Sequence, residues 1–104
     1  MGLHPWFIKP ETEENDFLAI ENACKEKKIM AIGECGLDKL KAPPMARQIE
    51  IFNRHVALSE TYKIPMIIHC VRAHDQVIAA RQAQLASMPW ILHGFAGSKE
   101  LAKK

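Results

Sequence analysis

Ile29-Met30-Ala31-Ile32-Gly33-Glu34 is the stretch that decides the fold, because a short apolar run ends there directly on a carboxylate. The same order recurs where Pro65-Met66-Ile67-Ile68 ends on His69 and where Trp90-Ile91-Leu92 ends on His93. Short, continuously apolar runs rich in isoleucine are typical of parallel strands that are buried on both faces. The expected strands are Ile29–Gly33, Met66–Ile68 and Trp90–Leu92.

The intervals between the strands carry apolar residues at helical spacing. Alternating helices and strands predict an α/β fold, which we expect to be part of a (β/α)8 TIM barrel. In it, three to four parallel strands carry helices on their outer face. The expected helices are Glu13–Lys28, Pro43-Pro44 to Lys63, about Ala73 to Ser87, and Lys99–Lys104 with an N-cap at Ser98.

Apolar stripes indicate which face of each expected helix is buried, and small residues indicate the loops. The stretches Glu34–Asp38 and Gly94–Gly97 are expected to be loops at strand ends. The expected stripes are Met45, Ile49, Phe52 and Val56 in the second helix, and Val77, Ile78, Arg81 and Leu85 in the third.

Glu34, His69 and His93 therefore occupy equivalent positions, each directly after a strand. Side chains at the carboxyl ends of parallel strands meet at one mouth of a barrel, where barrel enzymes keep their chemistry. Glu and His together are a ligand set suited to divalent metals. The three positions predict the metal site of a hydrolase.

Composition excludes several other classes of protein. The net charge of +2 is spread along 104 residues, so it does not indicate a nucleic-acid footprint by itself. No apolar run approaches the roughly 20 residues that a membrane span needs, so we expect no membrane partner and a cytoplasmic location. Cys24, Cys35 and Cys70 are odd in number and form no CxxC, which favours reduced thiols. Alternation along a strand argues against Cys35 and Cys70 as additional ligands.

Four motifs, in this order, resemble the TatD-type deoxyribonuclease family of metal-dependent hydrolases. Gln48 and Phe52 also match residues that are usual in the family. The resemblance covers essentially the whole chain. The motifs are Gly2-Leu3-His4-Pro5, Ala31-Ile32-Gly33-Glu34-Cys35-Gly36-Leu37-Asp38, Pro65-Met66-Ile67-Ile68-His69 and Leu92-His93-Gly94-Phe95-Ala96-Gly97-Ser98.

The resemblance implies a barrel with up to two divalent ions, Mg, Mn or Zn, that hydrolyses phosphodiester bonds in DNA or another phosphoester. It implies that Glu34 bridges the metals and that His69 and His93 are further ligands. It assigns catalytic roles to Glu34 and His4, with His4 also contacting substrate or a bound water. Arg72 could neutralise a substrate phosphate, although a solvated charge is an equal alternative.

Two family motifs have no counterpart here, an opening His-x-His and a late Asp that binds metal. A complete barrel needs about 250 residues, so we expect residues 1–104 to be one partial barrel domain. This chain by itself is expected to be inactive, and its exposed sheet edges could support a homo-oligomer. The alternatives are a non-catalytic self-associating module and a barrel hydrolase acting on other esters or on amides.

Other residues near these motifs are given structural roles. His55 and His74 are expected to be structural or exposed, and Asp38 is expected to organise its loop as a hydrogen-bond acceptor. Trp6 and Phe7 could stack against a nucleobase or pack on the barrel rim.

Overall fold

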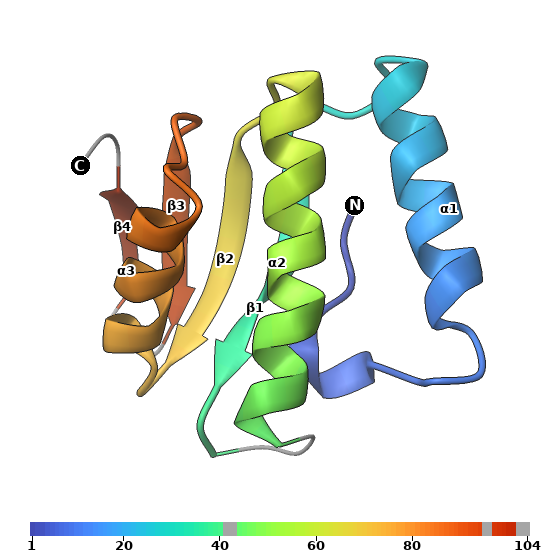
Figure 1. Ribbon diagram of the computed structural model, residues 1–104. Helices are drawn as coiled ribbons and strands as arrows, with labels where there is room; N and C mark the ends of the chain where they lie inside the picture. Colours follow the sequence, from blue (N-terminus) through green and yellow to red (C-terminus); the bar gives the residue numbers. More distant parts are fainter. Residues whose placement is uncertain (41–43, 95–96, 102–104) are drawn as a thin grey trace.

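The computed structural model describes residues 1–40, 44–94 and 97–101. Helices and strands alternate through most of the chain, as expected for an α/β protein (Figure 1). In chain order the elements are the 3-10 turn η1 (Pro5–Phe7), α1 (Glu13–Lys25), β1 (Ile32–Asp38), α2 (Met45–Tyr62), β2 (Met66–Val71), α3 (His74–Ala83), β3 (Trp90–Gly94) and β4 (Gly97–Leu101).

The strands form one sheet in the order β1-β2-β3-β4. The first three strands are parallel, and each parallel pair is joined through a helix. Helices α2 and α3 lie on the same side of the sheet, and α1 packs beside α2 (Figure 1). The predicted class, three parallel strands with helices on one face, is confirmed.

Strand β1 is longer than predicted and begins later. The stretch Glu34–Asp38, predicted to be a loop, lies within the strand. Residues Cys35 to Asp38 are all buried, and each pairs with a residue of β2, so the strand continues through the expected loop. At Gly36, φ is +144°, and a Cβ would lie 2.1 Å from the carbonyl oxygen of His69. Glycine thus lets β1 approach β2 at this point.

The predicted helix Lys99–Lys104 is wrong over the described residues. Gly97–Leu101 form β4, which pairs antiparallel with β3. A helix of barely two turns gains little against the unfavourable nucleation of its first turn. The open edge of β3 offers a complete row of backbone partners instead. Residues 102–104 lie outside the described residues, as do Phe95 and Ala96 of the predicted loop.

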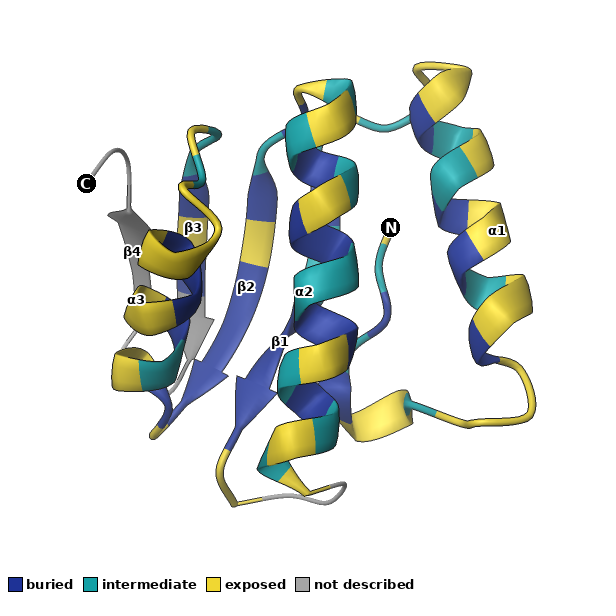
Figure 2. Cartoon of the chain, viewed as in Figure 1, coloured by how far each residue is buried: buried dark blue, intermediate teal, exposed yellow. Residues whose placement is uncertain are grey.

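Helix α2 buries one face against the sheet, as the dark stripe in Figure 2 shows. Phe52 and Val56 of the predicted stripe are completely buried, whereas Met45 and Ile49 are only partly buried. The remaining buried residues of α2 include polar ones, and they are Gln48, Ile51, His55 and Ser59. Polar side chains inside this face indicate hydrogen-bonding roles that an apolar pattern does not predict.

Helix α3 is shorter than predicted and buries less. Val77 and Arg81 of its predicted stripe are buried, but Ile78 and Leu85 are exposed. Leu85 lies beyond the last helical residue, Ala83, so the helical periodicity no longer applies to it. Among the described residues, no helix is long and apolar enough to cross a membrane.

Candidate metal centre

Strand register brings the predicted ligands to neighbouring positions. Gly36 pairs with His69, and His69 pairs with His93, so these three residues form one row across β1, β2 and β3. Glu34 lies two residues before Gly36, in the part of β1 where the pairing with β2 is irregular. The short turn η1 lies close to the carboxyl end of β1 (Figure 1) and has His4 as its N-cap.

His4, Glu34 and His69 converge. Each supplies one potential ligand atom, and these atoms all lie within 4.8 Å of one another. His4 Nε2 is 3.7 Å from Glu34 Oε1, and the imidazole centroids of His4 and His69 are 4.3 Å apart. Three residues distant in sequence thus form one compact group of carboxylate and imidazole donors.

His4 presents an N–H to this group. The backbone N–H of Trp6 donates to His4 Nδ1 over 3.1 Å, which assigns the imidazole proton to Nε2. Burial, together with the nearby His69, lowers the pKa of His4, while Glu34 and Asp38 oppose this shift. A neutral His4 therefore directs its Nε2–H toward Glu34. To ligate a metal through Nε2, it would have to give up the hydrogen bond from Trp6 or change its tautomer.

His69 has the same tautomer, but its N–H is bound within the protein. Its Nε2 lies 2.8 Å from Asp38 Oδ2, within the buried interior. Burial raises the pKa of Asp38, but hydrogen bonds from His69, Trp6 and the Leu40 backbone outweigh it, so the net pKa is lowered. The ionised carboxylate only accepts, which assigns the proton to His69 Nε2 and leaves Nδ1 as the lone-pair nitrogen. A carboxylate behind a histidine is the usual support for a metal ligand.

Asp38 is itself held in place from two sides. Its backbone N–H donates to Gln48 Oε1 (2.7 Å), and its carbonyl oxygen accepts from Gln48 Nε2 (3.1 Å). Its Oδ1 accepts from the Leu40 N–H, which confirms the predicted loop-organising role. Its contact with His69 was not predicted. The i, i+2 spacing of Gly36 and Asp38 on β1 is the signal that could have found it, because Gly36 pairs with His69.

His55 supports the other side of the centre, as a structural residue. Its Nε2 accepts the backbone N–H of Leu3 (2.9 Å), and its Nδ1 contacts the carbonyl oxygen of Ile51 (3.0 Å). This long-range hydrogen bond fixes the residue directly before His4. His74, by contrast, is exposed. The prediction that both histidines are structural or exposed agrees with these positions.

Two further predicted site residues lie close to the cluster along the backbone. His93 is next to His69 in the backbone register, but its side chain lies outside what is described. Arg72 directly follows β2 at the same end of the sheet, and its side chain is exposed. Their roles as ligand and substrate contact remain predictions. Cys35 and Cys70 are buried, and burial raises the pKa of both thiols, as expected for structural cysteines.

The donor set fits a divalent metal. Glu34 offers a carboxylate, His69 offers Nδ1, and the adjacent register position holds a second histidine, His93. Carboxylate and imidazole suit Zn²⁺ and Mn²⁺ better than they suit Ca²⁺. We therefore assign Glu34 and His69 as the residues of this chain that would hold a metal. His4 lies beside them and offers a hydrogen-bond donor, its Nε2–H.

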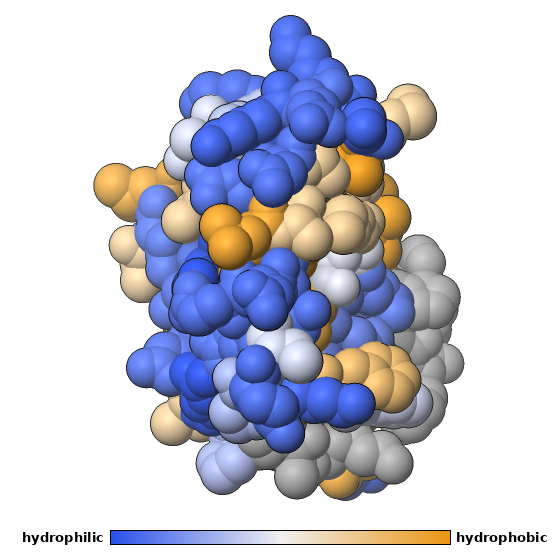
Figure 3. All heavy atoms as spheres, turned by 90° about the vertical axis from the view of Figure 1, so that its right-hand side faces the viewer, coloured by the Kyte–Doolittle hydropathy of each residue, from blue (hydrophilic) through white to orange (hydrophobic). Residues whose placement is uncertain are grey.

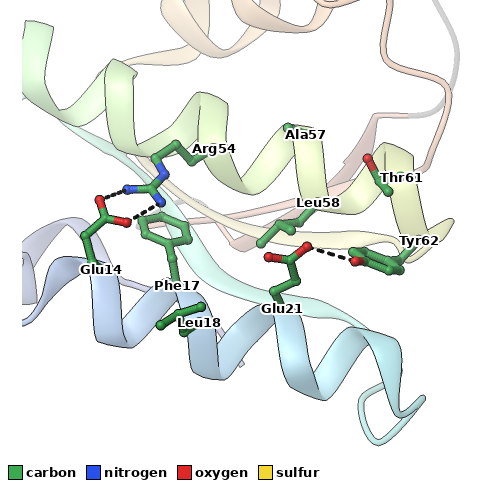
Figure 4. Close-up of a pocket in the computed structure, with 9 residues that line it drawn as sticks. All are labelled: Glu14, Phe17, Leu18, Glu21, Arg54, Ala57, Leu58, Thr61 and Tyr62. Carbon is green, nitrogen blue, oxygen red and sulfur yellow. Dashed lines mark hydrogen bonds and ion pairs between the residues drawn. The ribbon is translucent and has the colours of Figure 1, made fainter.

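A hollow of about 350 Å³ lies between α1 and α2 (Figure 4). Its polar groups bind one another, since Glu14 pairs with Arg54 and Tyr62 donates to Glu21. The face on the α1 side is largely hydrophilic, with some apolar atoms between the charged ones (Figure 3). The hollow contains none of the predicted site residues, so the cluster of His4, Glu34 and His69 is the better candidate site.

Comparison with known proteins gives one consistent result. A family model described as TatD related DNase matches residues 1–104. The chain is 32% identical over 111 residues to an uncharacterized metal-dependent hydrolase of Haemophilus influenzae, covering 100% of this chain. It is 29% identical over 103 residues to the 3'-5' ssDNA/RNA exonuclease TatD of Erwinia billingiae, covering 95% of this chain.

A solved structure shares the fold as well. The crystal structure of YjjV, a TatD homologue from Escherichia coli, superimposes with a TM-score of 0.71 at 25% identity. The match covers 83% of this chain and 34% of that protein. The chain likewise spans 42% of the Haemophilus relative and 38% of the Erwinia relative, well under half of each.

Proposed function

The chain belongs to the TatD related DNase family, and we propose that it supplies part of the active centre of a metal-dependent hydrolase that cleaves phosphodiester bonds in DNA. The observation that carries this proposal is the convergence of His4, Glu34 and His69, the last two from the adjacent parallel strands β1 and β2. The turn η1, which follows His4, lies close to the carboxyl end of β1 (Figure 1), and that end of a barrel sheet is where catalytic groups gather. The names of the relatives, which include hydrolases and a single-stranded DNA and RNA exonuclease, support the same reaction class.

Each residue has a separate role in the proposed reaction. Glu34 and His69 hold the metal, with His93 as an additional ligand. When bound, a divalent ion lowers the pKa of a coordinated water and stabilises charge on a phosphoryl group. His4 Nε2–H donates a hydrogen bond to a phosphoryl oxygen of the substrate, because Trp6 fixes its tautomer. Arg72, exposed at the same sheet end, neutralises a further phosphate charge.

The metal preference belongs to the proposal as well. Mn²⁺, Mg²⁺ and Zn²⁺ are the candidates, and up to two ions fit the family resemblance. A cytoplasmic location is supported by three free, buried thiols, Cys24, Cys35 and Cys70, which suit a reducing compartment.

Substitution of Glu34 tests the proposal in a protein with a complete barrel. Glu34→Gln removes the charge that holds the metal while its half-exposed side chain contributes little packing. We expect loss of roughly 100-fold or more of phosphodiesterase activity on a DNA oligonucleotide, with unchanged urea unfolding. Glu50→Gln, an exposed helix residue, is the matched control. Activity of the Glu34 variant within a few-fold of wild type would exclude Glu34 as a metal ligand.

A further inference from the structure

Trp6 donates two hydrogen bonds within the candidate metal centre, one from its backbone N–H and one from its indole N–H. Its backbone N–H donates to His4 Nδ1, and its indole Nε1–H donates to Asp38 Oδ2 over 2.6 Å. The same carboxylate oxygen contacts His69 Nε2 at 2.8 Å. The indole also packs edge-on against both imidazoles, with centroid distances of 5.0 Å to His4 and 5.4 Å to His69. One tryptophan thus contacts both histidines and the carboxylate behind one of them.

We propose that Trp6 is a positioning residue that sets the metal affinity of this centre by holding Asp38 against His69. This inference rests on the proposed metal-binding role of Glu34 and His69. It goes beyond that role by assigning a function to a residue that is not itself a metal ligand. The link runs from the indole N–H to Asp38 Oδ2 and from Asp38 to the His69 imidazole.

The burial of Asp38 gives this link its strength. The carboxylate is only 1% exposed, so water cannot replace a lost hydrogen-bond donor. The indole is 45% exposed, so it is not a core residue whose main role is packing. A carboxylate that loses the indole donor can rotate away from His69, because Leu40 N–H then remains its other fixed partner. The His69 ring would lose both its orientation and the tautomer that leaves Nδ1 available.

The choice of residue type agrees with this role. Phe7, the next residue, has an exposed ring 6.4 Å from the Trp6 ring but carries no hydrogen-bonding group. Trp90, the second tryptophan, lies completely buried in the core beside Phe52. Trp6 alone of these three aromatic residues combines an exposed position with a donor directed at the buried carboxylate.

Manganese binding by the chain tests the proposal directly. Free Mn²⁺ is measured by electron paramagnetic resonance, which requires no enzymatic activity. Trp6→Phe keeps an aromatic ring but removes the indole N–H, and we expect it to weaken Mn²⁺ binding roughly 10-fold or more. Leu18→Ala is the control, since it removes an exposed apolar side chain of α1 outside the centre, and its affinity should equal that of wild type. Circular dichroism confirms that all variants remain folded at the titration temperature.

A double-mutant cycle separates positioning from general loss of structure. If Trp6 acts through Asp38, Trp6→Phe has little further effect in an Asp38→Asn background. Equal Mn²⁺ affinity of Trp6→Phe and wild type, or additive effects of the two substitutions, would overturn the proposal. Failure of the wild-type chain to bind Mn²⁺ would instead remove the proposed metal site itself. The two failures are therefore distinguishable.

Discussion

Asp38 and His55 are both buried and ionisable, and their surroundings keep Asp38 ionised but His55 neutral. Asp38 stays ionised because three donors face its carboxylate, from His69, Trp6 and Leu40. His55 stays neutral because its ring is completely buried, and this burial lowers its pKa to about 4. Its hydrogen bond to the Leu3 N–H requires an unprotonated Nε2. The charge state of each residue is therefore tied to the position of the segment that carries His4.

The low pKa of His55 predicts an acid-sensitive fold. The unfolded chain takes up a proton near pH 6.5 but the folded chain only near pH 4, so stability decreases as pH falls through this interval. The loss attributable to His55 is at most about 3 kcal/mol. Urea unfolding between pH 7 and pH 4 should show a shallower pH dependence for His55→Gln than for wild type. His74→Gln, at an exposed histidine, should follow wild type, and parallel profiles for all three proteins would contradict the assignment.

At the scale of elements, side chains of α2 secure both β1 and α1. Gln48 forms two hydrogen bonds to the backbone of Asp38 at the end of β1. Arg47 and Arg54 both bind Glu13, a buried carboxylate at the start of α1. Polar contacts thus fix the ends of these elements, while apolar residues such as Phe17 and Phe52 pack in the core that the elements share.

Gln48→Ala should destabilise the fold and loosen the site. It leaves a buried N–H and a buried carbonyl oxygen of Asp38 without these partners, at a cost of about 2 kcal/mol. Urea unfolding measures the loss, and Gln82→Ala, at an exposed position of α3, provides the control. A stability change no larger than that of the control would show that Gln48 does not hold the end of β1.

Adjacent glutamates of α1 allow a matched comparison of buried and exposed ion pairs. Glu13 is buried, whereas Glu14 is exposed, and both bind Arg54. We expect Glu13→Ala to lower the free energy of unfolding by about 2 kcal/mol. Glu14→Ala should change it little, because water and salt replace an exposed pair. If urea unfolding gave equal losses of free energy for the two variants, burial would not strengthen the ion pairs of Glu13.

For the whole molecule, the two faces of the sheet differ. Helices α2 and α3 cover one face (Figure 1). Ile67 of β2 and Ile91 of β3 are paired in register and remain 37% and 38% exposed. Adjacent exposed isoleucines on a sheet favour association with another apolar surface.

The isolated chain is therefore expected to self-associate or to be only marginally stable. Sedimentation velocity over a range of concentrations should show association that decreases in the double variant Ile67→Thr, Ile91→Thr. Ile78→Thr, at an exposed isoleucine of α3, is the control and should behave as wild type. A wild-type chain that stays monomeric and resists urea as an ordinary domain does would contradict this expectation.

The sequence alone determined the α/β class and the candidate residues Glu34 and His69, because both depend on local patterns. Apolar runs and helical spacing report which segments are buried, and a polar residue directly after such a run stands out. The resemblance added His4, which neither periodicity nor composition would have selected.

Tertiary structure decided the remaining features, because each depends on partners distant in the chain. Strand β1 extends through Asp38 because β2 and Gln48 supply hydrogen-bond partners that local propensity does not encode. Gly97–Leu101 became a strand because the edge of β3 was open to it. The tautomer of His69 follows from Asp38, which lies 31 positions away in the sequence. Residues so far apart in the sequence become hydrogen-bond partners only when the chain folds, so the tertiary structure decided the chemistry of the site.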